Sequence, residues 1–181
     1  MTRRIEGTVT IEGARLVFRN FSGAEGQYNR EGDRNFGIIL EHDVAADLES
    51  AGWPVKYLKA KEDGDVPQPW LKVKVKFAQG SRPPRCVMVT SRKKTTLSED
   101  LVSLLDWSEI ESADIMISPY NWEVNGNTGV TPYLRQIYAT IRESELDLKY
   151  ADVPDARADS AMSATEGVTF APTDEDTPPW V

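Results

Sequence analysis

The sequence predicts a mainly β domain with a few short helices, followed by a disordered acidic tail. The clearest strand signal runs from Trp70 to Phe77, where apolar residues alternate with three lysines. Alternation with a period of two marks a strand with one buried face. Residues 151–181 are rich in Ala, Asp, Ser, Thr and Pro and show no periodicity. Such a segment buries too little apolar surface to offset its chain entropy, so we expect a folded domain over 1–150 and disorder over 151–181.

Eight segments of the expected domain carry strand patterns. In chain order they are 5–18, 34–40, 55–61, 70–77, 86–90, 113–118, 120–124 and 130–141. Gly13 interrupts the alternation of the first segment, which predicts a β-bulge there. Asn125-Gly126 marks the loop that joins the last two segments.

Two short helices are expected, over Asp43–Ala51 and over about Leu97–Asp106. Asp43 suits the N-cap of the first helix, and Gly52 suits the left-handed position that follows its last turn. Trp53 stands where a hydrophobic contact often completes such a helix end. Thr96 and Glu99 have the spacing of a capping box at the start of the second helix.

The net charge of −8 is unevenly distributed along the chain. Residues 1–150 hold 20 Lys and Arg against 22 Asp and Glu, whereas residues 151–181 hold 1 against 7. The segment Val66–Ser98 has no acidic residue and eight basic ones, which are Lys72, Lys74, Lys76, Arg82, Arg85, Arg92, Lys93 and Lys94. A local basic patch on a nearly neutral domain indicates a nucleic-acid-binding face.

Several classes of protein are excluded by what the sequence lacks. No apolar run approaches the ~20 residues of a transmembrane helix, and no apolar stretch follows the N-terminal arginines as a secretory signal requires. Cys86, the single cysteine, cannot form an internal disulfide and suits a reducing compartment. With His42 as the single histidine, a Cys/His zinc site within one chain is excluded. No phosphate-binding loop, nucleophile elbow or His-Glu-x-x-His motif is present, so we expect no catalytic residue, metal or cofactor.

The lysine strand is the first candidate for binding nucleic acid. Proteins hold single strands with a positively charged groove along the phosphates and with rings on which bases stack. The candidates of this region are Trp70, Lys72, Lys74 and Lys76, together with the nearby basic loop of Arg92, Lys93 and Lys94. The alternative is an ordinary solvated sheet face, or lysines that protect an edge strand. The absence of acid throughout the region favours binding.

The glycine-rich loop after the first strand alternates arginines with aromatic rings. Its candidates are Arg19, Phe21, Tyr28, Arg30 and Arg34. Glycines allow a backbone to approach a ligand closely, and rings exposed on a loop can stack on bases. The alternative for Phe21 is that it only plugs the loop. Phe18 and Phe36, at the ends of the flanking strands, are expected in the core.

Aromatic residues near the end of the domain form a third candidate group. Tyr120 and Trp122 share one face of their strand, as Tyr133 and Arg135 do on the next. They can stack on bases or on guanidinium planes. Aromatic side chains in strands are more often core, which we expect for Tyr138. For Tyr120 and Trp122 both interpretations stay open.

The tip of the tail combines acids with an apolar anchor. Its candidates for binding a partner protein are Asp174, Glu175, Asp176, Pro178, Pro179 and Trp180. This combination suits docking into a hydrophobic pocket with a basic rim. The alternative is a tail that only confers solubility.

Five stretches in order along residues 5–150 carry a resemblance. They are Ala14–Gly23, Asn29–Phe36, Gly52-Trp53, Ile117–Trp122 and Lys149-Tyr150. Together they resemble a family of tailed-phage single-stranded DNA-binding proteins. The resemblance implies an OB-fold, a small five-stranded barrel, acting in phage DNA replication, recombination or repair in the cytoplasm of an infected bacterial cell. The tail tip is similar to that of bacterial single-stranded DNA-binding proteins, which recruit partners, but it has Trp180 in place of Phe and adds Val181.

The sequence therefore predicts sequence-independent binding of single-stranded DNA, with RNA as a variant. The tail is expected to recruit replication or recombination proteins or to compete with DNA for the basic groove. The alternatives are a recruitment module in which the barrel is only a scaffold, and a nucleic-acid-processing enzyme, against which the missing carboxylate or histidine cluster argues. The oligomeric state, a homo-oligomer included, is left open.

Overall fold

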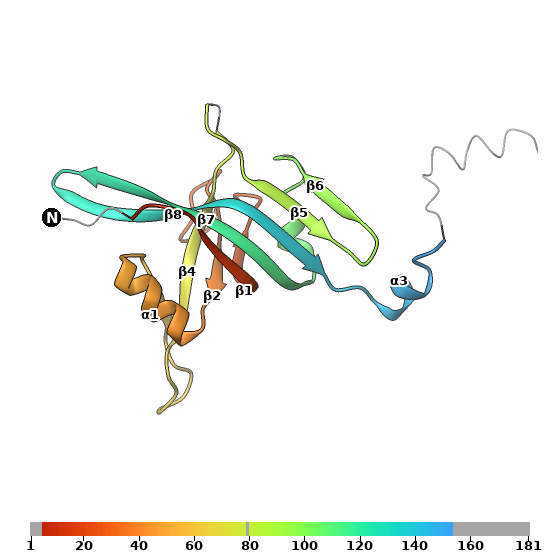
Figure 1. Ribbon diagram of the computed structural model, residues 1–181, viewed down its shortest axis with the longest axis horizontal. Coiled ribbons are helices and arrows are strands. Elements are labelled where there is room, and N and C mark those ends of the chain that lie inside the picture. Colours follow the sequence, from red (N-terminus) through yellow and green to blue (C-terminus); the bar gives the residue numbers. More distant parts are fainter. Residues whose placement is uncertain (1–4, 79, 154–181) are drawn as a thin grey trace, which may run out of the picture. The chain divides into compact units, whose positions relative to one another are not determined.

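The computed structural model describes residues 5–78 and 80–153. Its contacts divide the chain into two units, residues 1–144 and residues 145–181. The first unit contains β1 (Val9–Asn20), β2 (Arg34–Ile39), α1 (His42–Ala51), β3 (Lys56–Leu58), β4 (Gln68–Val75), β5 (Arg85–Val89), β6 (Lys94–Leu97), α2 (Leu104–Trp107), β7 (Ile110–Val124) and β8 (Asn127–Ile141) (Figure 1). The described part of the second unit contains α3 (Glu145–Lys149). The predicted disorder over 151–181 lies outside the described residues, apart from 151–153.

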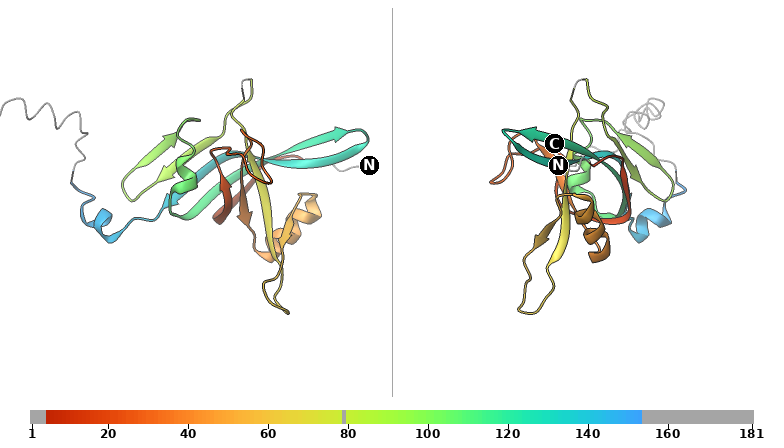
Figure 2. Two further views of the ribbon diagram at one scale, coloured as in Figure 1. Left: turned by 180° about the vertical axis from the view of Figure 1, so that it is seen from behind. Right: turned by 60° about the vertical axis from the view of Figure 1, so that its left-hand side comes forward.

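Five of the described strands close into a barrel. The sheet runs in the order β3-β4-β2-β1-β7-β8-β5-β6, and a further pairing joins β4 to β8. This pairing is parallel, with Lys74 opposite Tyr133, and it closes the ring β4-β2-β1-β7-β8. Figure 2 shows these strands from two further sides. The predicted β-rich, five-stranded barrel with a few short helices is confirmed.

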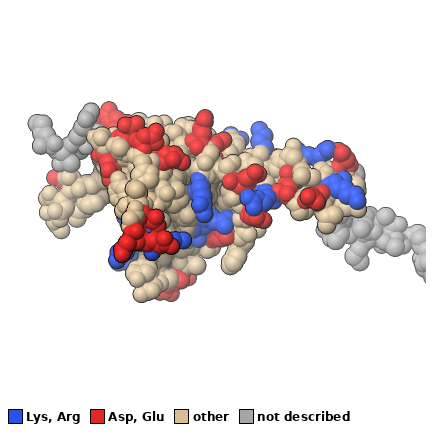
Figure 3. Space-filling model, turned by 90° about the horizontal axis from the view of Figure 1, so that it is seen from below, with Lys and Arg blue, Asp and Glu red and all other residues tan. Residues whose placement is uncertain are grey.

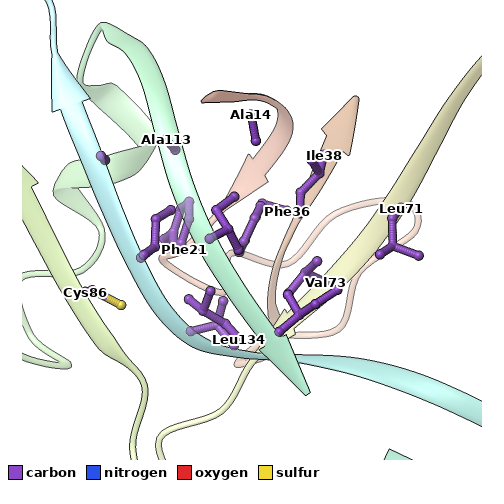
Figure 4. Close-up of a cluster of buried hydrophobic side chains, with 14 of the residues drawn as sticks. Ala14, Phe21, Phe36, Ile38, Leu71, Val73, Cys86, Ala113 and Leu134 are labelled. Carbon is purple, nitrogen blue, oxygen red and sulfur yellow. The ribbon is translucent and has the colours of Figure 1, made fainter. Parts of the chain in front are cut away.

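The core fills the barrel with apolar side chains from alternate strand positions. In β4, Leu71, Val73 and Val75 are buried while the lysines between them face outward, as the alternation predicts. Phe36 and Ile38 of β2 are fully buried beside them (Figure 4). Burying such a side chain contributes roughly 1.5–3 kcal/mol, so the inward face of each strand fixes its register.

Cys86 belongs to this core. Its side chain is fully buried in β5, and burial raises the pKa of its thiol to about 12. A neutral buried thiol behaves as a small apolar side chain, so the residue has a packing role.

The predicted bulge at Gly13 is confirmed. Ile11 pairs with Ile115 and Ala14 with Ala113, so two residues of β1 stand opposite Asp114. Gly13 has a φ of 61°, and its N–H donates to Asp114 Oδ1 at 2.9 Å. Glycine accepts this left-handed conformation without a Cβ clash.

Helix α1 ends as predicted but begins differently. Gly52 has a φ of 97°, its N–H donates to Glu49 O, and Trp53 is buried with its N–H donating to Leu48 O at 2.9 Å. The N-cap is Glu41, which makes no capping hydrogen bond through its side chain. The prediction of Asp43 at that position is wrong, because the helix begins one residue earlier than the pattern indicates.

The predicted helix over Leu97–Asp106 is largely wrong. Lys94–Leu97 form strand β6, and within the predicted segment only the single turn of α2 is helical. Thr96 pairs with Val87 of β5, so it caps no helix, and Glu99 pairs with Arg34 at 3.0 Å. The β-branched Thr95 and Thr96 suit a strand, and pairing with β5 overrides the local helix signal.

Strands β7 and β8 form one long hairpin. The two segments predicted over 113–118 and 120–124 are a single strand. Asn125 and Gly126 form the turn, both with positive φ, as a type I′ turn requires. β1 covers only Ala113–Ile117 of β7, so the outer half of the hairpin extends beyond the barrel (Figure 1). No helix among the described residues is long and apolar enough to cross a membrane.

Candidate nucleic-acid interface

Three adjoining hollows follow the outer face of β4. The largest, about 1030 Å³, lies between β4 and the loop that joins β1 to β2, and it contains Lys72, Lys74 and Lys76. A second, about 360 Å³, shares Lys76 and Tyr133 with it. A third, about 460 Å³, shares Tyr28 and Lys72 with it. Neighbouring hollows share lining residues, and we call the three together the β4 groove.

Lys72 and Lys74 of β4, and Lys76 directly after this strand, give the middle of the groove its positive charge. Lys74 and Lys76 are exposed, and Lys72 is partly buried. Partial burial lowers the pKa of Lys72, and the charges of Lys56 and Lys74 lower it further, against an opposing effect of Asp33. Three cations on one strand face, about 7 Å apart from one to the next at ~3.3 Å per residue, suit the regular charges of a phosphate backbone.

The loop between β1 and β2 forms the opposite wall and is held by Asn29. The Nδ2 amide of Asn29 donates to the carbonyl oxygens of Ala24, Arg30 and Asp33 at 2.9–3.0 Å. Its Oδ1 accepts a bond of 2.7 Å from Asn35. The fixed loop presents Tyr28, which is 89% exposed, and Arg30, which is also exposed, to the groove.

Two aromatic rings, those of Phe18 and Trp70, form one end of the groove. The sequence predicted only Trp70 as a binding residue. Trp70 is half-buried, and the ring of Phe18 meets it edge-on, with centroids 5.2 Å apart. Lys56 Nζ lies 5.5 Å from the Trp70 ring centre. The predicted core position of Phe18 is wrong, since 60% of this residue is exposed. Lys56 was missed, although pairing the predicted strands 55–61 and 70–77 as a hairpin would have placed it beside Trp70.

Phe21 does not reach the groove, and its predicted contact with DNA is wrong. The residue is fully buried, and its ring stacks on Phe36 with centroids 4.9 Å apart (Figure 4). Asp106 fixes this position, because its carboxylate accepts hydrogen bonds from the N–H groups of Phe21 and Ser22. The predicted core position of Phe36 is confirmed.

Two of the predicted arginines hold the fold together. Arg19 Nη1 donates to Leu105 O at 2.8 Å and to Ser108 O at 2.6 Å, which ties β1 to α2. Arg19 does not line the groove, and its contact with phosphate stays a prediction. Arg34 lines the groove wall, but its Nε donates to Phe21 O and its Nη1 pairs with Glu99.

The other end of the groove lies at the base of the β7–β8 hairpin. Tyr120 is 57% exposed and meets Tyr133 edge-on at 5.9 Å. Arg82 and Arg135, both exposed, line the same hollow.

Trp122 lies outside this hollow. Its ring covers Gly129 on the facing strand, in the place that a Cβ atom would occupy. A contact of Trp122 with DNA stays a prediction, and Tyr138 is half-buried beneath Arg85.

The basic loop of Arg92, Lys93 and Lys94 is not brought to the groove. It connects β5 to β6, and none of its residues lines the three hollows. β5 pairs with Gln136–Thr140 of β8, so the chain of β5 runs away from Tyr133 toward the basic loop. On the face seen in Figure 3, basic and acidic side chains are interspersed. A role of the loop in binding DNA therefore stays a prediction.

The remaining predictions concern metal ligands and the tip of the tail. Within residues 5–78 and 80–153, no three His, Cys, Asp or Glu side chains gather as metal ligands would. The candidates of the tail tip, Asp174 to Trp180, lie outside the described residues.

Comparisons with known proteins place the chain in a family. No curated protein matches the chain. The single-stranded DNA-binding protein of bacteriophage Enc34, truncated at its C-terminus, is 9% identical with a TM-score of 0.47, over 76% of this chain and 88% of that one. The Enc34 protein in complex with ssDNA is 12% identical with a TM-score of 0.45, over 76% and 88%. Gp2.5, a single-stranded DNA-binding protein of bacteriophage T7, is 12% identical with a TM-score of 0.36, over 92% and 99%. A family model described as "Putative phage ssDNA-binding domain" matches residues 1–178, and the chain therefore belongs to this family of phage single-stranded DNA-binding domains.

Proposed function

We propose that the β4 groove is the surface on which this phage single-stranded DNA-binding protein holds its ligand, without preference for sequence. Membership of the family makes the protein a DNA binder rather than an enzyme. The supporting observation is a row of three adjoining hollows with three lysines on one face and exposed rings at both ends. Lysines neutralise phosphates of any sequence, and rings stack on any base.

The test is a titration with oligo-dT at several salt concentrations, followed by quenching of tryptophan fluorescence. The wild type should bind oligo-dT tightly and duplex DNA weakly, with an affinity that falls with salt along a log–log slope of about −0.7 per contacted phosphate. The double variant Lys74→Ala/Lys76→Ala should reduce the magnitude of the slope by about 1.4, because two phosphate contacts are lost.

A matched double variant controls for net charge. Lys59 and Lys61 are exposed, and neither lines the groove. Lys59→Ala/Lys61→Ala should leave the slope nearly unchanged. Equal losses in the two double variants would show a diffuse electrostatic attraction and contradict the groove. RNA of the same length, used as a competitor, measures the preference for DNA.

We also propose that binding serves phage DNA replication, recombination or repair in the infected cell. Sequence-independent coating of exposed single strands is what these processes share, and the family membership supports a phage context. A phage carrying Lys74→Ala/Lys76→Ala should replicate its DNA poorly, and one carrying Lys59→Ala/Lys61→Ala should replicate normally.

The acidic tail is proposed to recruit a partner protein or to compete with DNA for the groove. The support comes from the sequence, since residues 151–181 carry seven acids against one basic residue and end in Pro178-Pro179-Trp180-Val181. An acidic segment tethered to a basic groove has a high effective concentration there.

A further inference from the structure

We propose that Phe18 is the residue on which a DNA base stacks at the β3 end of the groove, and that Trp70 is a positioning residue that supports the Phe18 ring. This inference rests on the proposed function, in which the β4 groove holds single-stranded DNA. It assigns distinct roles to two adjacent rings, of which the sequence had identified only Trp70.

The backbone at Phe18 is unusual for such a residue. Val17 pairs with Gly37 and Asn20 with Asn35, so Phe18 and Arg19 together stand opposite Phe36 in a second bulge of β1. Phe18 has a φ of 49°, in the left-handed region that bulky residues rarely adopt. The bulge turns the Phe18 side chain outward, while Arg19 is directed to α2.

Two unfavourable features therefore coincide at one residue. A strained backbone conformation and a large exposed apolar ring both reduce the stability of the folded state. The nearby rings of Phe21 and Phe36 are fully buried, so the core of this fold accommodates phenylalanine side chains. Strain of this kind is found where a side chain must be held ready for a ligand.

Trp70 is placed to support the Phe18 ring. A Cβ atom at Gly37 would lie 2.9 Å from Trp70 Cε3 and 2.9 Å from Val17 Cγ2, so the Trp70 ring rests directly on the backbone of Gly37. Lys56 Nζ lies 5.5 Å from its centre, and the edge contact with Phe18 occupies a further side. Trp70 is half-buried by these neighbours, which leaves the Phe18 ring as the larger free surface.

The chemistry of the hollow around Phe18 fits one nucleotide unit of a single strand. It is lined by ten residues that include Lys56 and Lys72 and no acidic side chain. A base stacked on Phe18 brings its flanking phosphates within reach of these two ammonium groups. Paired bases in a duplex cannot stack in this way without unpairing, so the same ring favours single strands over duplex.

The experiment compares Phe18→Gly with the wild type in binding to oligo-dT. Glycine accepts positive φ, so the substitution removes the ring and also relieves the backbone. Affinity should fall by about 5- to 150-fold, the range that corresponds to the loss of one stacked base. The salt slope should not change, because no phosphate contact is lost. The melting temperature of the variant should stay equal to that of the wild type or rise.

Three controls isolate stacking from packing. Trp107 is 87% exposed and lies outside the groove, so Trp107→Ala should leave the affinity unchanged. An abasic oligonucleotide of equal length offers phosphates without bases, and the difference between Phe18→Gly and the wild type should disappear on it. Phe18→Tyr, which keeps the ring, should restore most of the affinity.

The outcomes separate this inference from the proposed function. If the wild-type protein did not bind oligo-dT at low salt, both the proposed function and this inference would be wrong. Wild-type binding combined with unchanged affinity in Phe18→Gly would overturn the role of Phe18 alone. A lowered melting temperature in Phe18→Gly, or an equal loss of affinity on the abasic strand, would show that Phe18 is a structural residue and would also overturn its role.

Discussion

Lys72 holds its proton less firmly than an isolated lysine, because it is partly buried and lies near Lys56 and Lys74. The charged form attracts phosphate, so we expect affinity for DNA to fall when rising pH removes the proton. Because the pKa of Lys72 is lowered, this loss begins at a lower pH than it would for an ordinary lysine of pKa about 10.4.

The residue-scale prediction uses Lys72→Arg, because arginine stays protonated throughout this range. The ratio of its affinity for oligo-dT to that of the wild type should grow as the pH rises from about 7 to about 10. Lys59→Arg, outside the groove, should give a flat ratio. A flat ratio for Lys72→Arg as well would mean that Lys72 does not contact the ligand.

Phe18 and Phe21 illustrate how much of the site the sequence could reveal. Alternation predicts Phe18 in the core and leaves Phe21 for the loop surface, and the structure reverses both. The reason is the bulge between Val17 and Asn20, which changes the face to which each following side chain points. The first bulge can be predicted from the sequence because it contains a glycine, Gly13. The second bulge contains no glycine and gives no local signal.

At the scale of elements, Gly37 in β2 sets the position of Trp70 in β4. The space above Gly37 is filled by the rings and methyl groups of the neighbouring strands. Gly37→Ala should destabilise the protein by about 1–3 kcal/mol, the usual cost of overpacking. It should also displace Trp70 and weaken binding of oligo-dT.

Thermal unfolding followed by circular dichroism measures the first effect, and titration measures the second. Gly26→Ala is the matched control, since nothing lies within 4 Å of a Cβ atom placed there. The melting temperature of this control should change little. A Gly37→Ala variant as stable as Gly26→Ala would contradict the close contact between Trp70 and β2.

Local patterns predicted the strands better than the second helix. The strand predicted over Trp70–Phe77 is confirmed as far as Val75, because a period of two is a direct consequence of one buried face. The segment 97–106 carried a capping signal, yet Thr95 and Thr96 pair with β5. A capping pattern gives no information about such a pairing. The closure between β4 and β8 has no local signal either, and only the family resemblance implied a barrel.

At the scale of the whole molecule, the charges of the tail tip should regulate access to the groove. The full-length variant Asp174→Asn/Glu175→Gln/Asp176→Asn removes three negative charges without shortening the chain. If the tail competes with DNA, this variant should bind oligo-dT more tightly at low salt, and the difference should shrink as salt screens both interactions.

A variant with uncharged substitutions in the same segment, Ser160→Gln/Ser163→Gln, serves as the control and should match the wild type. Equal affinity of the charge variant and the wild type at low salt would rule out competition. Recruitment of a partner protein would then be the remaining role proposed for the tail.

The barrel closes at a single register pair among its described strands, where Lys74 of β4 stands opposite Tyr133 of β8. Both residues also line the groove, so the groove crosses the seam of the barrel. On the proposed function, a DNA strand lying there would contact β4 and β8 at once and hold the two strands together. A ligand that binds only the closed barrel stabilises it, so bound DNA should slow the opening of the seam between β4 and β8.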